Sequence, residues 1–311
     1  MNNDPRVSVI IATYNSSGSL HIALQSLLNQ TFPDFEAWII GDACTDDSEE
    51  VVASFQDERL NWFNRTTNSG SQGAPNNEGL ERARGTYHAY LGHDDLWFPW
   101  HLAGLVSLIE ETDADLVHPL CAMVSPGGLE GMVGPPAPGQ DYDSHYVFPS
   151  AWLHHRRVVE KCGNWGDHLK LGRGVDHEFL GRIHRAGGEI RFCPQLSLLK
   201  FPSKFWRSYA PCSEPPQMGF RDSMMAHPTD LQHDLLFEAA TMSARHASAR
   251  VPVGEALLQL MRSVLRATAE VGGRDLGPLG RLWVWRFQRM RRKRRRDRGL
   301  APLVPNQRME G

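Results

Sequence analysis

The feature that most constrains the fold is an alternation of short apolar runs with helical patterns over residues 7–95. The apolar runs predict strands at VSVII (7–11), FEAWIIGD (35–42), LNWFNR (60–65) and YHAYLGHDD (87–95). Helices are predicted between them at residues 15–30, 46–55 and 76–85, from apolar residues at helical spacing, an acidic first turn and a closing glycine. This alternation is typical of an α/β fold with a mostly parallel sheet flanked by helices.

After residue 95, the composition and the predicted secondary structure of the chain change several times. Residues 119–149 are rich in Pro and Gly and are expected to form a loop, whereas residues 172–188 read as a loop entering a helix that stops at a glycine pair. From residue 228 onward the spacing is helical. We therefore expect a domain at 1–205, a helical extension at 206–280 and a basic C-terminal tail at 281–311.

Charge and cysteine usage narrow the class of protein. Residues 281–298 hold ten Lys or Arg and one Asp, whereas residues 1–280 hold 22 Lys or Arg and 34 Asp or Glu. The five cysteines are scattered without a CxxC pair, which indicates neither a disulfide framework nor a zinc site and favours a reducing compartment. The opening MNNDPRVSVIIATYN has neither a basic n-region nor a long apolar run, so we expect no signal peptide and a cytoplasmic location.

Polar residues recur where predicted strands end, in TYN, GDACTDD and GHDD. Ligands of such sheets bind at the carboxyl ends of the strands. The adjacent Asp94 and Asp95 would repel each other if both were ionised and dry, so they need water, a basic partner or a cation. Mg²⁺ and Mn²⁺ are commonly held by one or two carboxylates and completed by substrate phosphates, which predicts a metal site for a diphosphate. The alternative is that the pair caps a helix beginning near Pro99.

Five segments occur in register along the chain: VSVIIATYN, GDACTDDS, NSGSQGAPNNEGLERARG, YLGHDDLW and GVDHEFLGRIHRAGG. Together they resemble the family 2 glycosyltransferases, a large inverting group with the Rossmann-like GT-A fold. The resemblance extends roughly over residues 5–205, and SAWLHHRRVVEKCGNW resembles that family's acceptor-side segment. It implies a nucleoside-diphosphate-sugar donor such as a UDP- or GDP-sugar, a Mn²⁺ or Mg²⁺ ion, and a carbohydrate or lipid-linked acceptor.

The resemblance also implies roles for residues on the donor side. Thr13, Tyr14 and Asn15 would line the nucleotide pocket, with Tyr14 near the base. Asp42 would contact the base or the ribose, and Asn76 or its neighbour Pro75 falls near the phosphates.

On the reacting side, the resemblance implies that Asp95 binds the metal and that Asp94 reaches the ribose or the metal. Asp176 would be the general base that deprotonates the acceptor hydroxyl, with inversion at the anomeric carbon. An aspartate at such a position can instead cap a helix. His177 and Glu178 are weaker candidates for the base.

Several positions depart from the family pattern. Gly41 and Gly92 stand where the family usually has an aspartate, Val175 replaces a glutamate, and the arginine that many members place near Asn76 is absent. The departures imply either altered nucleotide contacts or a catalytically silent relative that binds sugar nucleotides. Retention of both metal aspartates and the base favours the first. A nucleotidyltransferase is less expected, because ATYNSSGS carries no basic residue for a triphosphate.

Some histidines and tryptophans are candidates for a metal site or a sugar-binding site, but structural roles also explain them. His93, His154 and His155 lack the i, i+4 spacing of a helical metal site, so we expect them on the surface or supporting a site. Trp97 and Trp100 would either form an apolar wall for a sugar or pack in the core.

The basic tail at residues 281–311 has two possible roles. Residues 281–298 would lie on an anionic membrane surface, or form a solvated tail. Nucleic acid is an unlikely partner, because the acidic body would repel a polyanion. Membrane docking fits a protein acting on the inner face of the plasma membrane in cell-surface polysaccharide or glycolipid synthesis.

Overall fold

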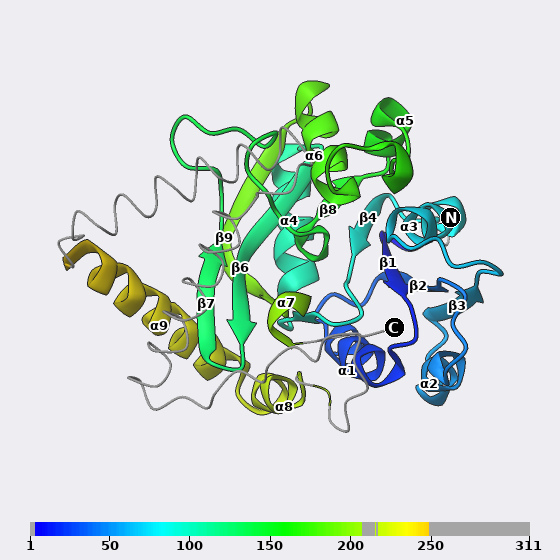
Figure 1. Ribbon diagram of the computed structural model, residues 1–311, viewed down its shortest axis with the longest axis horizontal. Helices are drawn as coiled ribbons and strands as arrows, with labels where there is room; N and C mark the ends of the chain where they lie inside the picture. Colours follow the sequence, from blue (N-terminus) through cyan, green and yellow to red (C-terminus); the bar gives the residue numbers. More distant parts are fainter. Residues whose placement is uncertain (1–3, 207–214, 216, 249–311) are drawn as a thin grey trace, which may run out of the picture. The chain divides into compact units, whose positions relative to one another are not determined.

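The computed structural model describes residues 4–206, 215 and 217–248 (Figure 1). The chain divides into two compact units, Met1–Arg245 and His246–Gly311, and the sheet belongs to the first. The helical pattern expected at residues 253–271 and the basic tail at 281–311 lie outside the described residues. In the part of the chain that is described, no helix is long and apolar enough to cross a membrane.

One mixed sheet organises this unit, with strand order β3-β2-β1-β4-β8-β6-β9-β5 and with β7 paired to β6. Strands β1 to β4 are parallel, β8 runs antiparallel to both β4 and β6, and β9 is parallel to β6. The strands are β1 Val7–Thr13, β2 Phe35–Gly41, β3 Leu60–Asn64, β4 Tyr87–Tyr90, β5 Leu96–Trp97, β6 Leu116–Ser125, β7 Gly128–Val133, β8 Leu153–His155 and β9 Ile190–Lys200. The α/β fold expected from the sequence is confirmed, but the sheet is mixed rather than mostly parallel, because β5, β7 and β8 pair antiparallel with their neighbours.

Helices fill the connections between the strands. Helix α3 packs on β1 and β2, whereas α4 packs on β6 and β9. The helices are α1 Ser17–Leu28, α2 Ser48–Ser54, α3 Gly73–Arg82, α4 His101–Thr112, α5 Arg157–Cys162, α6 Val175–Arg185, α7 Ser203–Trp206, α8 Met218–Ala226 and α9 Pro228–Ser248. Short 3₁₀ turns stand at Pro149–Ala151 and His168–Lys170.

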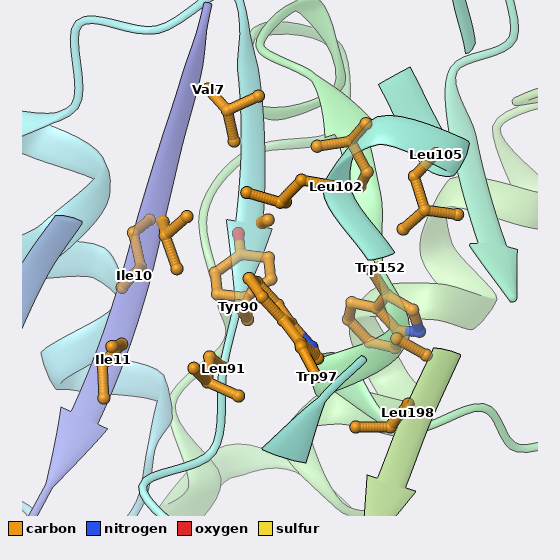
Figure 2. Close-up of a cluster of buried hydrophobic side chains, with 14 of the residues drawn as sticks. Val7, Ile10, Ile11, Tyr90, Leu91, Trp97, Leu102, Leu105, Trp152 and Leu198 are labelled. Atoms are coloured by element: carbon orange, nitrogen blue, oxygen red, sulfur yellow. The ribbon is translucent and has the colours of Figure 1, made fainter. Parts of the chain in front are cut away.

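The core explains why the central strands read as continuous apolar runs. Six of the seven residues of β1 are buried, because β1 is hydrogen-bonded on both edges and covered on both faces. Figure 2 shows side chains from distant segments meeting there, with Ile10 of β1 near Tyr90 of β4, and Trp97 beside Trp152. Full burial of Trp97 confirms the core alternative for this residue over an apolar wall for a sugar.

The prediction of a loop over residues 119–149 was wrong in its first half. Strands β6 and β7 form an antiparallel hairpin there, and only the segment after Val133 is irregular. The apolar residues of LVHPLCAMVS outweigh its proline, since β6 is buried between β8 and β9. Position 119 tolerates proline at a register shift between β6 and β9.

Candidate active site

Two neighbouring cavities open at the carboxyl ends of β1 and β4. The larger has a volume of about 880 Å³ and the smaller about 290 Å³. Both are lined by Ala12, Gly70, Ser71, Gln72 and His93, so they share a wall. Their position matches the expectation that strand-end polar residues gather around a ligand.

The smaller cavity collects residues predicted to hold the nucleotide. Thr13, Tyr14, Asp42 and Pro75 line it. Tyr14 is 43% exposed, and Thr13 Oγ1 is buried with no hydrogen-bond partner among the described residues. Asn15 is not part of the lining; its side-chain oxygen accepts a hydrogen bond from the Thr45 amide at 2.8 Å.

Asp42 is fixed by its neighbours rather than free in the cavity. Its carboxylate forms an ion pair with Arg65 and accepts hydrogen bonds from the amide and hydroxyl of Ser69, both at 2.8 Å. The preceding Gly41 has no room for a side chain, because a Cβ there would lie 2.6 Å from Asn64 Oδ1 and 2.8 Å from the Trp62 ring. Packing against β3 therefore accounts for the aspartate missing at position 41.

Asp94 and Asp95 point in different directions. A turn closed by the Asp95 amide on the Gly92 carbonyl, at 3.0 Å, places Asp94 in the lining of the larger cavity. Asp95 is fully buried, and its carboxylate accepts hydrogen bonds from the Ser150 hydroxyl, the Phe201 amide at 3.1 Å and Lys200 Nζ at 2.8 Å. Neither caps a helix: α4 begins at His101, so the alternative of an aspartate cap was wrong.

Burial dominates the electrostatics of this pair. It raises the pKa of the Asp95 carboxyl, the Lys200 ammonium opposes that shift, and the charge of Asp94 adds to it. Lys200 Nζ also lies 3.7 Å from Asp94 Oδ1, so one cation faces both carboxylates. Gly92 cannot carry a third carboxylate here, since a Cβ would lie 2.6 Å from Asp95 Oδ2.

The donor set at the cavity suits a divalent cation only in part. Within the described ranges, no group of three or more His, Cys, Asp or Glu side chains is arranged to hold a metal ion. Asp94 offers one carboxylate at the cavity, and one carboxylate completed by substrate phosphates and water is a common way to bind Mg²⁺. The residues therefore fit a metal that arrives with a diphosphate, with Asp94 as its protein ligand.

Asp176 lines the same cavity from α6. It is the second residue of α6, whose N-cap is Gly174, so the alternative of an aspartate cap was wrong here too. Its Oδ1 accepts from the His177 amide at 2.8 Å, and its Oδ2 accepts from the Tyr146 hydroxyl and, at 3.5 Å, from Gln72 Nε2. Val175 beside it is buried and also borders the cavity.

Asn76 stands on α3 in the wall of the larger cavity, as expected for a residue near the phosphates. It is 2% exposed, and its Nδ2 has no hydrogen-bond partner among the residues described. A buried amide donor costs free energy unless something accepts from it. A ligand oxygen would satisfy it.

Several lining residues were not predicted from the sequence. Arg173, Lys200 and Lys204 supply cations, and Tyr146 and Phe148 supply aromatic rings. None belongs to a motif that stands out in one sequence. The only signal was the proximity of Arg173 to Asp176 along the chain.

Beyond the sheet, Gln217 supports the Asp94 turn. It precedes α8, is 1% exposed, and its Nε2 donates to the Asp94 carbonyl at 3.0 Å. The segment expected to be a separate extension therefore contacts the site.

The histidines divide between the surface and the interior. His154 is fully buried and shares a hydrogen bond of 3.0 Å with the Tyr90 hydroxyl, so the expectation of a surface position fails for it. His155 is half-buried, and His93 borders both cavities with Nδ1 at 3.1 Å from the Ala12 carbonyl. Trp100 packs against a second apolar cluster and donates to the Leu196 carbonyl at 3.1 Å.

The fold and the site define the class: a GT-A protein with a mixed sheet and cavities at the strand ends. The fold matches that of TarS 1–349 from S. aureus in complex with UDP-GlcNAc, at a TM-score of 0.55 and 20% identity over 71% of this chain and 70% of that one. It also matches the mannosyltransferase PcManGT from Pyrobaculum calidifontis, solved with GDP-Man and Mn²⁺, at a TM-score of 0.55 and 16% identity over 88% of each chain.

Sequence comparison then gives the family. The model described as Glycosyl transferase family 2 matches residues 8–155. Residues 8–155, just under half of the chain, are therefore similar to this family, as the motifs had indicated.

Two relatives illustrate the match. The first is an Escherichia coli protein, UDP-Glc:alpha-D-GlcNAc-diphosphoundecaprenol beta-1,3-glucosyltransferase WfaP, 32% identical over 33% of this chain and 41% of its own length. The second is the poly(ribitol-phosphate) beta-glucosyltransferase of Bacillus spizizenii, 35% identical over 29% of this chain and 15% of its own length. The chain thus spans less than half the length of these relatives.

Proposed function

We propose that the protein is an inverting glycosyltransferase that moves a sugar from a nucleoside diphosphate to an acceptor hydroxyl. The observation that carries this proposal is the larger cavity, which Asp176 of α6 lines together with Asp94 and Asn76. A volume of about 880 Å³ is enough for a sugar diphosphate with an acceptor group beside it. The smaller cavity would take the nucleobase against Tyr14.

The chemistry follows from these positions. The acceptor oxygen forms a bond to the anomeric carbon while the bond to the diphosphate breaks on the opposite face, so the configuration inverts. Asp176 takes the proton of the acceptor hydroxyl, the role of a general base, which is worth about 10²–10⁴-fold in rate. Asn76 would donate to a phosphate oxygen, and Asp42 would orient the base or ribose edge.

A Mn²⁺ or Mg²⁺ ion would be held by Asp94 together with the diphosphate. When bound, it supplies positive charge against the leaving diphosphate. We assign the metal contact to Asp94 rather than Asp95, because three protein donors already engage the Asp95 carboxylate.

The acceptor and the cellular place are inferred from the relatives' names and from the tail. The names of both relatives point to glycans or polymers of the cell surface, which supports a carbohydrate or lipid-linked acceptor. Residues 281–298 would hold the protein at the inner face of an anionic membrane.

The rival is a silent relative that binds sugar nucleotides without turnover. The presence of Asp176 at the cavity, hydrogen-bonded on both oxygens, favours an active enzyme. Donor binding with no turnover of any donor would support the rival.

The test combines binding with turnover on the full chain. Calorimetric titration with UDP and GDP, with and without Mn²⁺, identifies the nucleotide. A panel of the matching nucleotide sugars, with water or simple glycosides as acceptor, then gives diphosphate release. We expect Asp176→Asn to bind the nucleotide as wild type does and to lose about 10²-fold or more in turnover. Failure of wild type to bind either nucleotide under any metal condition would overturn the proposal.

A further inference from the structure

A loop segment, residues 141–146, contacts both ends of α6 and Arg173, which precedes it. Asp143 Oδ1 forms an ion pair with Arg173 Nη1 at 2.8 Å and another with Arg185. The Asp143 carbonyl shares a hydrogen bond of 2.9 Å with His177 Nε2. These contacts hold the segment on both sides of Asp176 along the chain.

Gly181 of α6 permits this close approach. A Cβ at that position would lie 2.4 Å from Asp143 Oδ1 and 2.9 Å from Arg185 Nη1. Because position 181 has no side chain, the Asp143 carboxylate can approach α6 closely. The contacts of residues 141–146 with α6 therefore depend on packing as well as on charge.

The last residue of this segment, Tyr146, contacts Asp176. The Tyr146 hydroxyl donates to Asp176 Oδ2, while Oδ1 accepts from the His177 amide. The Tyr146 ring packs edge-on against Phe148 and His177, at centroid distances of 5.1 and 5.9 Å. Tyr146 and Phe148 both line the larger cavity beside Asp176.

Tyr146 is suited to donate and unsuited to lose its proton. Burial raises the pKa of the Tyr146 phenol, and the Asp176 carboxylate raises it further. The phenol therefore stays protonated and offers its hydrogen to Oδ2.

An aspartate side chain rotates broadly about its terminal bond, so its carboxylate has no intrinsic orientation. The His177 amide on Oδ1 and the Tyr146 hydroxyl on Oδ2 set that orientation, and Gln72 Nε2 adds a longer contact to Oδ2 at 3.5 Å. Proton transfer needs the acceptor hydroxyl within hydrogen-bond reach of a correctly turned lone pair, and small misplacements cost large factors in rate.

We propose that Tyr146 is a positioning residue for the general base Asp176, holding the carboxylate so that its remaining lone pairs face the acceptor hydroxyl. The inference rests on the proposed function and adds a residue to it. It gives the loop after β7 a role in turnover that is separate from donor binding.

The test compares Tyr146→Phe with a matched control, Tyr142→Phe. Tyr142 belongs to the same segment, but its hydroxyl pairs with His118 Nε2 at 2.8 Å, and it is not among the residues that line the cavity. Each variant removes one phenolic oxygen. The measurements are affinity for UDP or GDP, thermal midpoint, and diphosphate release from the nucleotide sugar that wild type turns over.

We expect Tyr146→Phe to lower kcat by about 10- to 100-fold, with nucleotide affinity within about twofold of wild type. Tyr142→Phe should keep the wild-type kcat. In the Asp176→Asn background, Tyr146→Phe should cause no further loss, because a residue that acts only through Asp176 has nothing left to position.

Three results would overturn the inference. They are a wild-type kcat in Tyr146→Phe, an equal loss in Tyr142→Phe, and multiplication of the Tyr146 and Asp176 effects in the double variant. A wild-type protein that binds no nucleotide would remove the proposed function as well, so the two failures are distinguishable.

Discussion

Exchanging each of the two adjacent aspartates for asparagine separates a structural carboxylate from a ligand-facing one. Asp95→Asn replaces the charged partner of Lys200 in a fully buried position. Removing one partner of a buried ion pair costs about 3–5 kcal/mol. Because the Lys200 side chain keeps 19% exposure, we expect the lower end of that range. A loss of about 3 kcal/mol lowers Tm by about 5 °C in a chain of 311 residues, because the entropy of unfolding is about 2.1 cal/mol/K per residue.

Asp94→Asn is the matched control, one residue away and equal in chemistry. It leaves the contact between Asp95 and Lys200 in place and removes a like charge that raises the pKa of Asp95. Its drop in Tm should therefore be smaller than that of Asp95→Asn, since Lys200 Nζ lies 3.7 Å from Asp94 Oδ1 but 2.8 Å from Asp95 Oδ2. Metal-dependent affinity for UDP or GDP should nevertheless fall about tenfold or more.

Thermal unfolding followed by circular dichroism, together with calorimetric titration in Mn²⁺, decides between the two aspartates. A stable Asp95→Asn variant that has lost metal-dependent binding, beside an Asp94→Asn variant that retains it, would refute the reasoning. Asp95 would then be the metal ligand that the family resemblance implied.

Two further predictions concern stability. Gly92→Ala should cost about 1–3 kcal/mol, because its Cβ would meet Asp95 Oδ2 at 2.6 Å; an unchanged Tm would show that the turn yields easily. His88 and His154 are buried, which lowers their pKa values to about 2 and about 4. Unfolded histidines titrate near pH 6.5, so stability present above that pH should fall towards pH 5, by up to about 1.4 kcal/mol per pH unit for each residue. The Tm of wild type should drop as the pH is lowered from about 6.5 to about 5, and the Tm of His88→Phe should drop less. A wild-type Tm that does not change over this pH range would contradict the argument.

The sequence was sufficient for the first half of the fold because its signals are local there. The spacing of apolar residues, the turn residues and the polar residues at strand ends identified β1 to β4 and the helices between them. The order of the remaining strands could not be predicted from the sequence. Strand β8 lies between β4 and β6, and it pairs there with residues that are distant from it along the chain. The β6–β7 hairpin was missed because proline and glycine were read as loop residues, whereas burial of β6 outweighed that composition.

The candidate site was predicted where a motif and its chain position coincide. Asp42, Asp94, Asn76 and Asp176 all line one of the two cavities. Residues such as Tyr146 and Lys200 carry no local signal, because they reach the site through a loop and a strand end that only the tertiary fold brings together.

The pair Asp94–Asp95 also shows why adjacency in sequence is weak evidence for a shared ligand. In the tight turn from Gly92 to Asp95, Asp94 lines the cavity and the Asp95 carboxylate turns inward to Ser150 and Lys200. The inward carboxylate fills the space that a side chain at position 92 would need. Loss of the first aspartate and burial of the last are therefore two aspects of one packing arrangement, which leaves a single carboxylate of this motif to face a ligand.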